Sequence, residues 1–329
     1  MAAVSSTKMG TDDLPRESRM FAWLNESKDS AETMSLEQIN NELKDLFNRL
    51  KIAKEKAANV VPEKESNRVL HSFSKARKEC TKMFKKRDYV VEKPNMRFFR
   101  VYELLMPLLE LTETYEVSVM VNYARREDHD VFKQLKTDGT ISQASKMSTA
   151  SILNSSLWFS YAPQYHSVDI FHGNYGIDCI KNGKYERQED MAADGICSEI
   201  LFGMLLLREN GSMIIKSYTF FTKKMQCALG MLFNHFNVQI VKGRFSKSTN
   251  SERFIVCTNY RNILTYAQVM EFSKRMSCDT YPLQDVLTIE RSLVEHQIKA
   301  LEVNVEILTC YKKGELNTEA RAEFLSKCL

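Results

Sequence analysis

The chain has 329 residues, a formal net charge of +4, and 43% hydrophobic against 27% charged residues, which is ordinary composition for a folded protein of two or three domains, or of one large domain with helical additions. No apolar run reaches the roughly 18 residues of a membrane span. The first residues are polar and lack the apolar core of a secretion signal. We therefore expect a protein of the cytoplasm or nucleus that is neither secreted nor bound to a membrane.

The eight cysteines contain no Cys-x-x-Cys pair, and no histidine stands at zinc-finger spacing from them. This pattern argues against a zinc site and against a disulfide framework, and it predicts buried free thiols. We expect no metal ligands in this chain.

The N-terminal part divides into two segments. Residues 1–32 are polar and are expected to form a flexible tail. Residues 33–93 are expected to form a helical, basic region, with an amphipathic helix over 34–58 and a second helix over 65–87. Positive charge is concentrated over 75–100, which suits a polyanion, and Lys85, Lys86 and Arg87 are candidate RNA contacts. The alternative for such a cluster is a solvated helix face.

An α/β core is predicted over residues 94–265. Its first half is expected to contain, in order, a helix over 97–111, a strand over 115–121, a helix or loop over 122–136, an unstructured connection over 137–156, a short aromatic strand over 157–161 and a loop over 163–184. Its second half alternates strand and helix, which favours a mainly parallel sheet. In that half we expect a strand ending at Asp194, a helix to Leu207, a strand over 212–216, a helix, and a strand over 254–257. Residues 266–329 are expected to form a helical tail.

Three polar residues stand at the ends of the predicted strands of the second half. Asp194 and Lys216 end strands, and Glu252 precedes the last one. If that last strand is antiparallel, all three meet at one edge of the sheet, where open α/β sheets place their ligands. A lysine near apolar walls or another cation has a lowered pKa and can act as a base, which a carboxylate can orient. Taken singly, the three are better explained as a turn, a strand-end lysine and a surface acid; taken together, they favour a site.

The segments Asp-Met-Ala-Ala-Asp-Gly, Gly-Ser-Met-Ile-Ile-Lys-Ser-Tyr and Asn-Ser-Glu-Arg-Phe-Ile-Val-Cys resemble the FtsJ (RrmJ-like) family of RNA 2′-O-ribose methyltransferases, most of all its cap-directed branch. The resemblance covers about residues 95–260. It implies a Rossmann-type methyltransferase sheet flanked by helices, S-adenosylmethionine as cofactor, and RNA, with a capped 5′ end as a candidate, as substrate. The family uses a Lys-Asp-Lys-Glu tetrad, to which the resemblance assigns Asp194, Lys216 as the base, and Glu252. Arg100 stands where the family has its first lysine.

The cofactor turn departs from the family pattern. Asn122, Tyr123 and Ala124 occupy its place, and no glycine follows before Gly139. Without glycine, Cβ atoms crowd the close approach of a cofactor to the backbone. The sequence therefore leaves two main hypotheses: a methyltransferase, or an inactive RNA-binding subunit that works with another protein. A helical interaction protein is a third. In either RNA hypothesis the basic residues Lys242, Arg244 and Lys247 are candidate phosphate contacts.

Overall fold

The computed structural model describes residues 34–60, 96–112, 117–122, 127–137, 139–176, 187–243, 246, 249–275 and 283–312. The chain divides into two compact units, Met1–Met34 and Ser35–Leu329. The elements described below belong to the second unit. The expected tail, the basic helix over 65–87 and the candidate contacts Lys85, Lys86 and Arg87 lie outside the described residues.

A six-stranded sheet in the order β2-β1-β3-β4-β6-β5 forms the centre of the fold. The strands are β1 (Ser118–Asn122), β2 (Gln143–Met147), β3 (Val168–Gly173), β4 (Leu207–Ser217), β5 (Asn237–Val241) and β6 (Arg253–Thr258). The first four run parallel, and β6 is antiparallel to both β4 and β5. The order reverses between β1 and β3, so the sheet is doubly wound, and sheets of this kind bind ligands at the carboxyl ends of those strands. The predicted α/β fold is confirmed.

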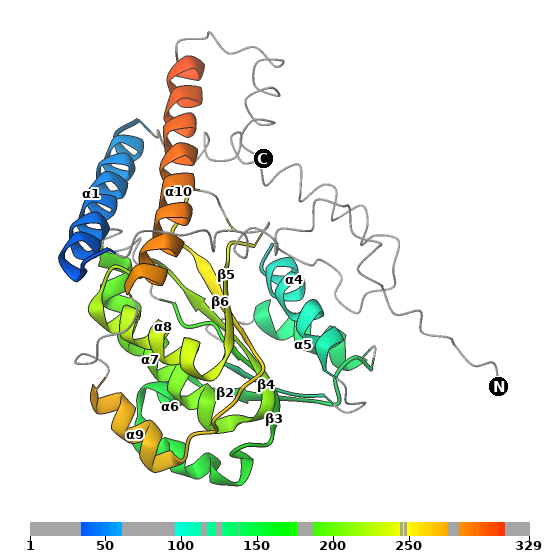
Figure 1. The fold of residues 1–329 in the computed structure, drawn as a ribbon. Coiled ribbons are helices and arrows are strands. Elements are labelled where there is room, and N and C mark those ends of the chain that lie inside the picture. The colour runs from blue at the N-terminus through cyan, green and yellow to red at the C-terminus, as the bar shows by residue number, and fades with distance from the viewer. Residues whose placement is uncertain are drawn as a thin grey trace. The chain divides into compact units, whose positions relative to one another are not determined.

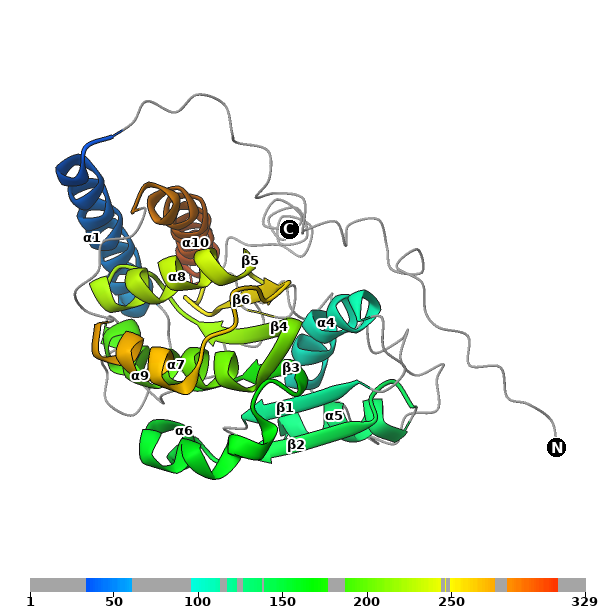
Figure 2. The ribbon, with the colours of Figure 1, turned by 60° about the horizontal axis from the view of Figure 1, so that its bottom comes forward.

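Helices cover both faces of this sheet (Figures 1 and 2). One face carries α4 (Met96–Leu111) and α5 (Glu127–Thr137), and the other carries α7 (Gln188–Leu206) and α8 (Lys223–His235). Shorter elements complete the fold: α6 (Thr149–Leu153), the 3-10 helix η3 (Ser155–Gln164) and α9 (Tyr266–Arg275).

Two long helices, α1 (Leu36–Val60) and α10 (Leu283–Lys312), pack side by side (Figure 1). Apolar residues recur along α1 at helical spacing and are buried at Ile39, Leu43, Leu46 and Leu50. An ion pair between Glu42 and Arg291 joins the two helices at their surface. The helices predicted near both ends of this unit are thus confirmed.

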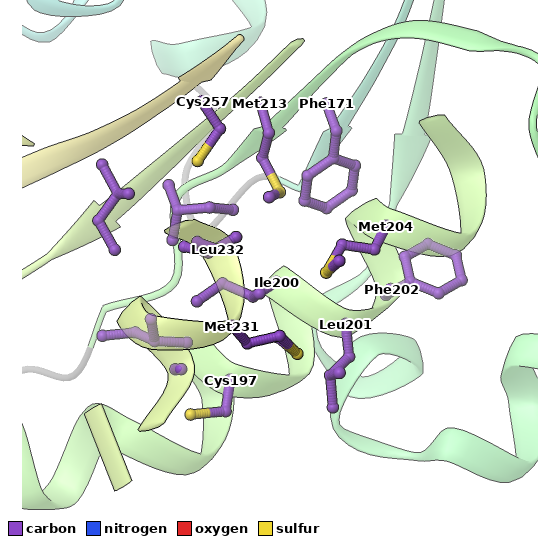
Figure 3. Close-up of a cluster of buried hydrophobic side chains, with 14 of the residues drawn as sticks. Phe171, Cys197, Ile200, Leu201, Phe202, Met204, Met213, Met231, Leu232 and Cys257 are labelled. Atoms are coloured by element: carbon purple, nitrogen blue, oxygen red, sulfur yellow. The ribbon is translucent and has the colours of Figure 1, made fainter. Parts of the chain in front are cut away.

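Each face of the sheet has its own apolar cluster. On the α7 side, Phe171 and Met213 from the strands meet Ile200 and Met204 of α7 and Leu232 of α8 (Figure 3). On the other side, alternate strand residues pack against α4 and α5; they include Val119, Val121, Ile170, Ile214 and Phe254. Three cysteines, Cys197, Cys227 and Cys257, are buried free thiols, as predicted for them.

Four expectations for the core were wrong. The connection over 137–156 contains β2 and α6, the aromatic strand over 157–161 is part of η3, and the loop over 163–184 contains β3. Residues 190–194 are not a strand but lie in α7. This helix has Glu189 and Asp190 in its first turn, where acids favour the helix dipole, and it is apolar nearly all round because neighbours enclose it. In addition, β5 was not predicted. The polar strand β2 is tolerated because it lies at a sheet edge.

Candidate functional site

Three polar side chains converge on one face of the sheet at its carboxyl edge. His172 lies near the end of β3, Lys216 near the end of β4, and Glu252 directly before β6, which runs the other way. Because strand side chains alternate between faces, residues two positions apart share a face. Each of the three is two positions from a residue buried beneath α4 and α5, namely Ile170, Ile214 and Phe254. They therefore face α4, which carries Arg100.

Arg100 of α4 and Glu252, directly before β6, form an ion pair. Arg100 is half-buried and Glu252 is buried. The hydroxyl of Ser246 donates a hydrogen bond of 2.9 Å to the same carboxylate oxygen. Burial alone would raise the pKa of Glu252, but Arg100, Lys216, the Ser246 hydrogen bond and Lys242 together hold it below its ordinary value. Glu252 is thus a carboxylate held ionised by the cations around it, as the sequence led us to expect for this group.

Lys216 extends from β4 toward the loop that follows β3. Its ammonium nitrogen lies 5.8 Å from the centre of the Tyr218 ring. A Cβ atom on Gly176 would lie 2.5 Å from that nitrogen, so the glycine makes room for the ammonium group. Its charge acts on both Glu252 and His172. Of the three residues predicted to converge, Lys216 and Glu252 therefore meet, and Arg100, which the family resemblance added, lies with them.

His172, near the end of β3, is the third polar residue of the cluster, beside Lys216 and Glu252. The residue is fully buried, and neither ring nitrogen has a hydrogen-bond partner among the described residues. Burial, followed by the charge of Lys216, lowers the pKa of His172 to about 4, so the imidazole is neutral at pH 7. Its ring centre lies 5.9 Å from that of Phe132 on α5. The sequence pattern did not single out His172 as a site residue; the only signal was the short run Val168-Asp-Ile-Phe171 before it, which is apolar at three of its four positions.

Asp194 does not belong to this cluster, which corrects the expectation from the sequence. It lies in α7, which covers the opposite face of the sheet. Its side chain is 81% exposed and pairs with Lys224 of α8. The following residue, Gly195, does not form a turn; it leaves space for the ring of Tyr175, which would come within 2.2 Å of a Cβ atom there. The strand ends that meet at this edge therefore present a histidine where the family resemblance requires a carboxylate.

Lys242 has a positioning role in place of the expected contact with phosphate. Its ammonium group donates hydrogen bonds to the carbonyl and side-chain oxygens of Asn250, at 2.6 and 3.0 Å, and to the carbonyl of Glu252, at 2.9 Å. These bonds use its three donors. Burial, followed by the charge of Arg253, lowers its pKa to about 7, although Glu252 opposes the shift. The other two candidates in this loop, Arg244 and Lys247, lie outside the described residues.

The crevice between β1 and β3 is where a nucleoside cofactor would bind in such a sheet. Asn122 is the last residue of β1, while Tyr123 and Ala124 lie outside the described residues. Doubly wound sheets hold nucleosides with a glycine-rich turn after the first strand and an acid further on that binds the ribose. Here no glycine follows β1 before Gly139, and β2 leads into Ser148 and Thr149 without an acid. The residues present do not fit a cofactor held in this way.

The described residues also contain no group of three histidine, cysteine or acidic side chains that could hold a metal ion. Over the same ranges, no helix is both long and apolar enough to cross a membrane.

The doubly wound sheet, with Lys216 and Glu252 at its carboxyl edge, defines the class of Rossmann-type α/β proteins to which methyltransferases belong. No family model matches the chain. Curated relatives match parts of it, and the following three are among them. Cap-specific mRNA (nucleoside-2′-O-)-methyltransferase 2 of Danio rerio is 34% identical over 102 residues, which are 31% of this chain and 14% of that protein. The probable methyltransferase EP424R of African swine fever virus is 34% identical over 125 residues, 36% of this chain and 28% of that protein.

The third relative, cap-specific mRNA (nucleoside-2′-O-)-methyltransferase 1 of Drosophila melanogaster, is 26% identical over 150 residues, 45% of this chain and 18% of that protein. The match thus spans less than a third of each relative's own length. The resemblance found in the sequence is confirmed: over part of its length the chain is similar to cap-specific mRNA 2′-O-methyltransferases and to a probable viral methyltransferase.

Proposed function

We propose that the chain binds single-stranded RNA at the carboxyl edge of its sheet, as a methyltransferase homologue whose transfer centre is incomplete. The observation that carries this proposal is the charge around Glu252. Arg100, Lys216 and Lys242 all act on this one carboxylate, and Lys54 adds its charge to the surroundings of Lys242. Even without Lys242, whose pKa is about 7, Arg100 and Lys216 outnumber this one carboxylate, and an excess of cations favours the phosphates of RNA.

Two features support an incomplete transfer centre. His172 is neutral at pH 7, so it does not supply the negative charge with which a carboxylate would orient and balance Lys216. Arg100 keeps a positive charge but cannot release its proton as a lysine can. Together with the poor fit of the cofactor crevice, these features favour binding over catalysis.

The second candidate is an active RNA 2′-O-methyltransferase that uses S-adenosylmethionine. The convergence of Lys216, Glu252 and Arg100 favours it, as do the named activities of the relatives. In this candidate Lys216 removes the proton of the ribose hydroxyl, while Glu252 and Arg100 hold the hydroxyl in place. S-adenosylmethionine would supply the methyl group.

Calorimetric titration with S-adenosylmethionine separates the two candidates. We expect no saturable binding at millimolar cofactor, no methyl transfer to capped or uncapped RNA, and intact RNA binding. Saturable cofactor binding together with methyl transfer that Lys216→Ala abolishes would establish the enzyme instead. A chain that binds neither RNA nor cofactor would contradict both candidates.

RNA affinity should fall steeply as salt increases, because binding to phosphates releases counterions. Replacing Lys85, Lys86 and Arg87 together by alanine should reduce the slope of log affinity against log salt by up to about 0.7 for each phosphate that the variant leaves without its cation. Fluorescence anisotropy of a labelled RNA across a salt series measures this slope. A slope near zero in the unmodified protein would contradict electrostatic RNA binding.

A further inference from the structure

A pocket lies beside the charged cluster, between α1, the start of α7 and the segment after β4. Its empty volume is about 340 Å³, and it is open to solvent. Phe47, Leu50, Lys51 and Lys54 of α1 line one side. The other side is lined by Gln188, Glu189, Tyr218, Thr219, Phe221 and Ser251. This empty space includes open solvent, so the pocket is a shallow hollow in the surface and not an enclosed cavity.

Two residues that line the pocket, Tyr218 and Ser251, also adjoin residues of the charged cluster. Tyr218 lines the pocket, and the ammonium group of Lys216 lies 5.8 Å from the centre of its ring. Ser251 also lines it and directly precedes Glu252. The side chain of Lys54 donates a hydrogen bond of 2.8 Å to the Ser251 hydroxyl, which fixes α1 to this wall. A molecule in the pocket therefore lies one side chain away from Lys216.

The lining combines aromatic rings with cations. The rings of Phe47 and Phe221 meet edge to face with their centres 5.3 Å apart, and both residues are partly exposed. Lys51 lies one helical turn after Phe47, and Lys54 lies two turns after it. Both therefore place positive charge on the same side of α1. Aromatic rings that stack on bases, next to lysines that pair with phosphates, are the two components of single-stranded nucleic-acid sites.

The wall of the pocket also contains one acid, Glu189, whose carboxylate is bound within the fold. Glu189 is buried, and its carboxylate accepts hydrogen bonds from the Thr219 hydroxyl at 2.6 Å and from the backbone of Phe221 and Thr222 at 3.0 and 2.6 Å. Burial raises the pKa of Glu189, although these hydrogen bonds oppose the shift. Its role is to hold the segment after β4 against α7, so that the pocket keeps its shape.

We propose that this pocket holds one nucleotide of a single-stranded RNA, with its base against Phe47 and Phe221 and its phosphate paired with Lys51. The adjoining ribose then reaches Lys216 across Tyr218. The inference rests on the proposed RNA binding and adds to it a position for the strand, with α1 as one side of the RNA site.

The test uses the full chain and a fluorescein-labelled single-stranded RNA of eight nucleotides, followed by anisotropy without any cofactor. Phe47→Leu keeps the apolar volume but removes the ring, and Phe47→Tyr keeps the ring. Lys51→Ala removes a pocket cation, and Lys56→Ala removes an exposed cation of the same helix outside the pocket. Circular dichroism establishes that each variant is folded.

We expect Phe47→Leu and Lys51→Ala each to weaken RNA binding roughly tenfold, because the first removes base stacking and the second removes a cation that pairs with phosphate. Phe47→Tyr and Lys56→Ala should bind like the unmodified protein. Unchanged affinity in both pocket variants, or an equal loss in Lys56→Ala, would overturn the pocket while leaving RNA binding elsewhere in place. An unmodified protein without RNA affinity would instead overturn the proposed function.

Discussion

His172 on β3 and Lys216 on β4 lie at the ends of neighbouring parallel strands, and the charge of Lys216 adds to burial in keeping the imidazole neutral. A carboxylate at this position would balance the lysine charge, whereas a neutral imidazole contributes no charge to do so. In the function proposed above, this difference directs Lys216 at phosphate, whereas a carboxylate at the same position would prepare it for proton transfer.

The first prediction concerns a carboxylate at this position. His172→Asp should weaken RNA binding severalfold, because the new charge attracts Lys216 away from phosphate. His172→Asn is the matched neutral control and should bind RNA like the unmodified protein. Anisotropy gives both affinities. Methyl transfer by His172→Asp where the unmodified protein shows none would mean that the missing acid alone had disabled an otherwise intact enzyme.

The second prediction follows from the pKa of His172, which is lowered from 6.5 to about 4. The unfolded chain therefore binds more protons than the folded one between these values, so stability is lost as pH falls from 6.5 to 4. The full difference amounts to about 3 kcal/mol. Urea unfolding at a series of pH values should show this acid loss in the unmodified protein.

His172→Asn should reduce the same acid loss, whereas His166→Asn, at an exposed position, should retain it. An equal loss of stability in His172→Asn would mean that another group titrates over this range.

The site could be predicted from the sequence only where an apolar run marked the strand that carries the residue. Lys216 and Glu252 follow and precede short apolar runs that fold as β4 and β6, so their convergence could be inferred. Asp194 lies in an apolar stretch whose pattern does not distinguish a buried helix from a buried strand. The placement of His172 depended on β3, whose run Val168-Asp-Ile-Phe171 is short, is interrupted by an acid and is followed closely by Gly173 and Gly176. Only the pairing of β3 with β1 and β4 identifies it as a central strand.

The third prediction tests the space around Lys216. Gly176→Ala would place a Cβ atom 2.5 Å from the ammonium nitrogen, which is the end of a flexible side chain and can move. We expect a severalfold loss of RNA affinity with little change in the melting temperature. Gly139→Ala is the matched control: its Cβ meets no described atom within 4 Å, but its φ of +77° disfavours alanine.

Gly139→Ala should therefore lose about 1 kcal/mol of stability and keep its RNA affinity. Thermal melting and anisotropy on both variants give the comparison. A normal affinity in Gly176→Ala would show that the position of Lys216 does not matter for binding.

The fourth prediction concerns the buried pair of Arg253 and Glu290, which joins β6 to α10. The side chains are 3% and 0% exposed, and a guanidinium nitrogen of Arg253 lies 2.6 Å from a carboxylate oxygen of Glu290. Glu290 also accepts a hydrogen bond from the backbone N–H of Phe220. Arg253→Met leaves a buried acid without its cation and should cost about 3–5 kcal/mol. Arg275→Met removes the surface pair with Glu271 and should cost less than about 1 kcal/mol. Similar costs for the two variants in urea unfolding would contradict the structural role of the buried pair.

The pairing of α1 with α10 has a consequence for the newly synthesised chain. The interactions that hold α1 in place join residues far apart in sequence: Lys54 reaches Ser251, 197 positions later, and Glu42 pairs with Arg291, 249 positions later. During translation α1 leaves the ribosome long before either partner exists, and its apolar stripe stays uncovered for most of synthesis. A wall of the RNA pocket is thus put in place among the last steps of folding, and ribosome-bound chains that end before α10 should leave Phe47 open to proteases and chaperones.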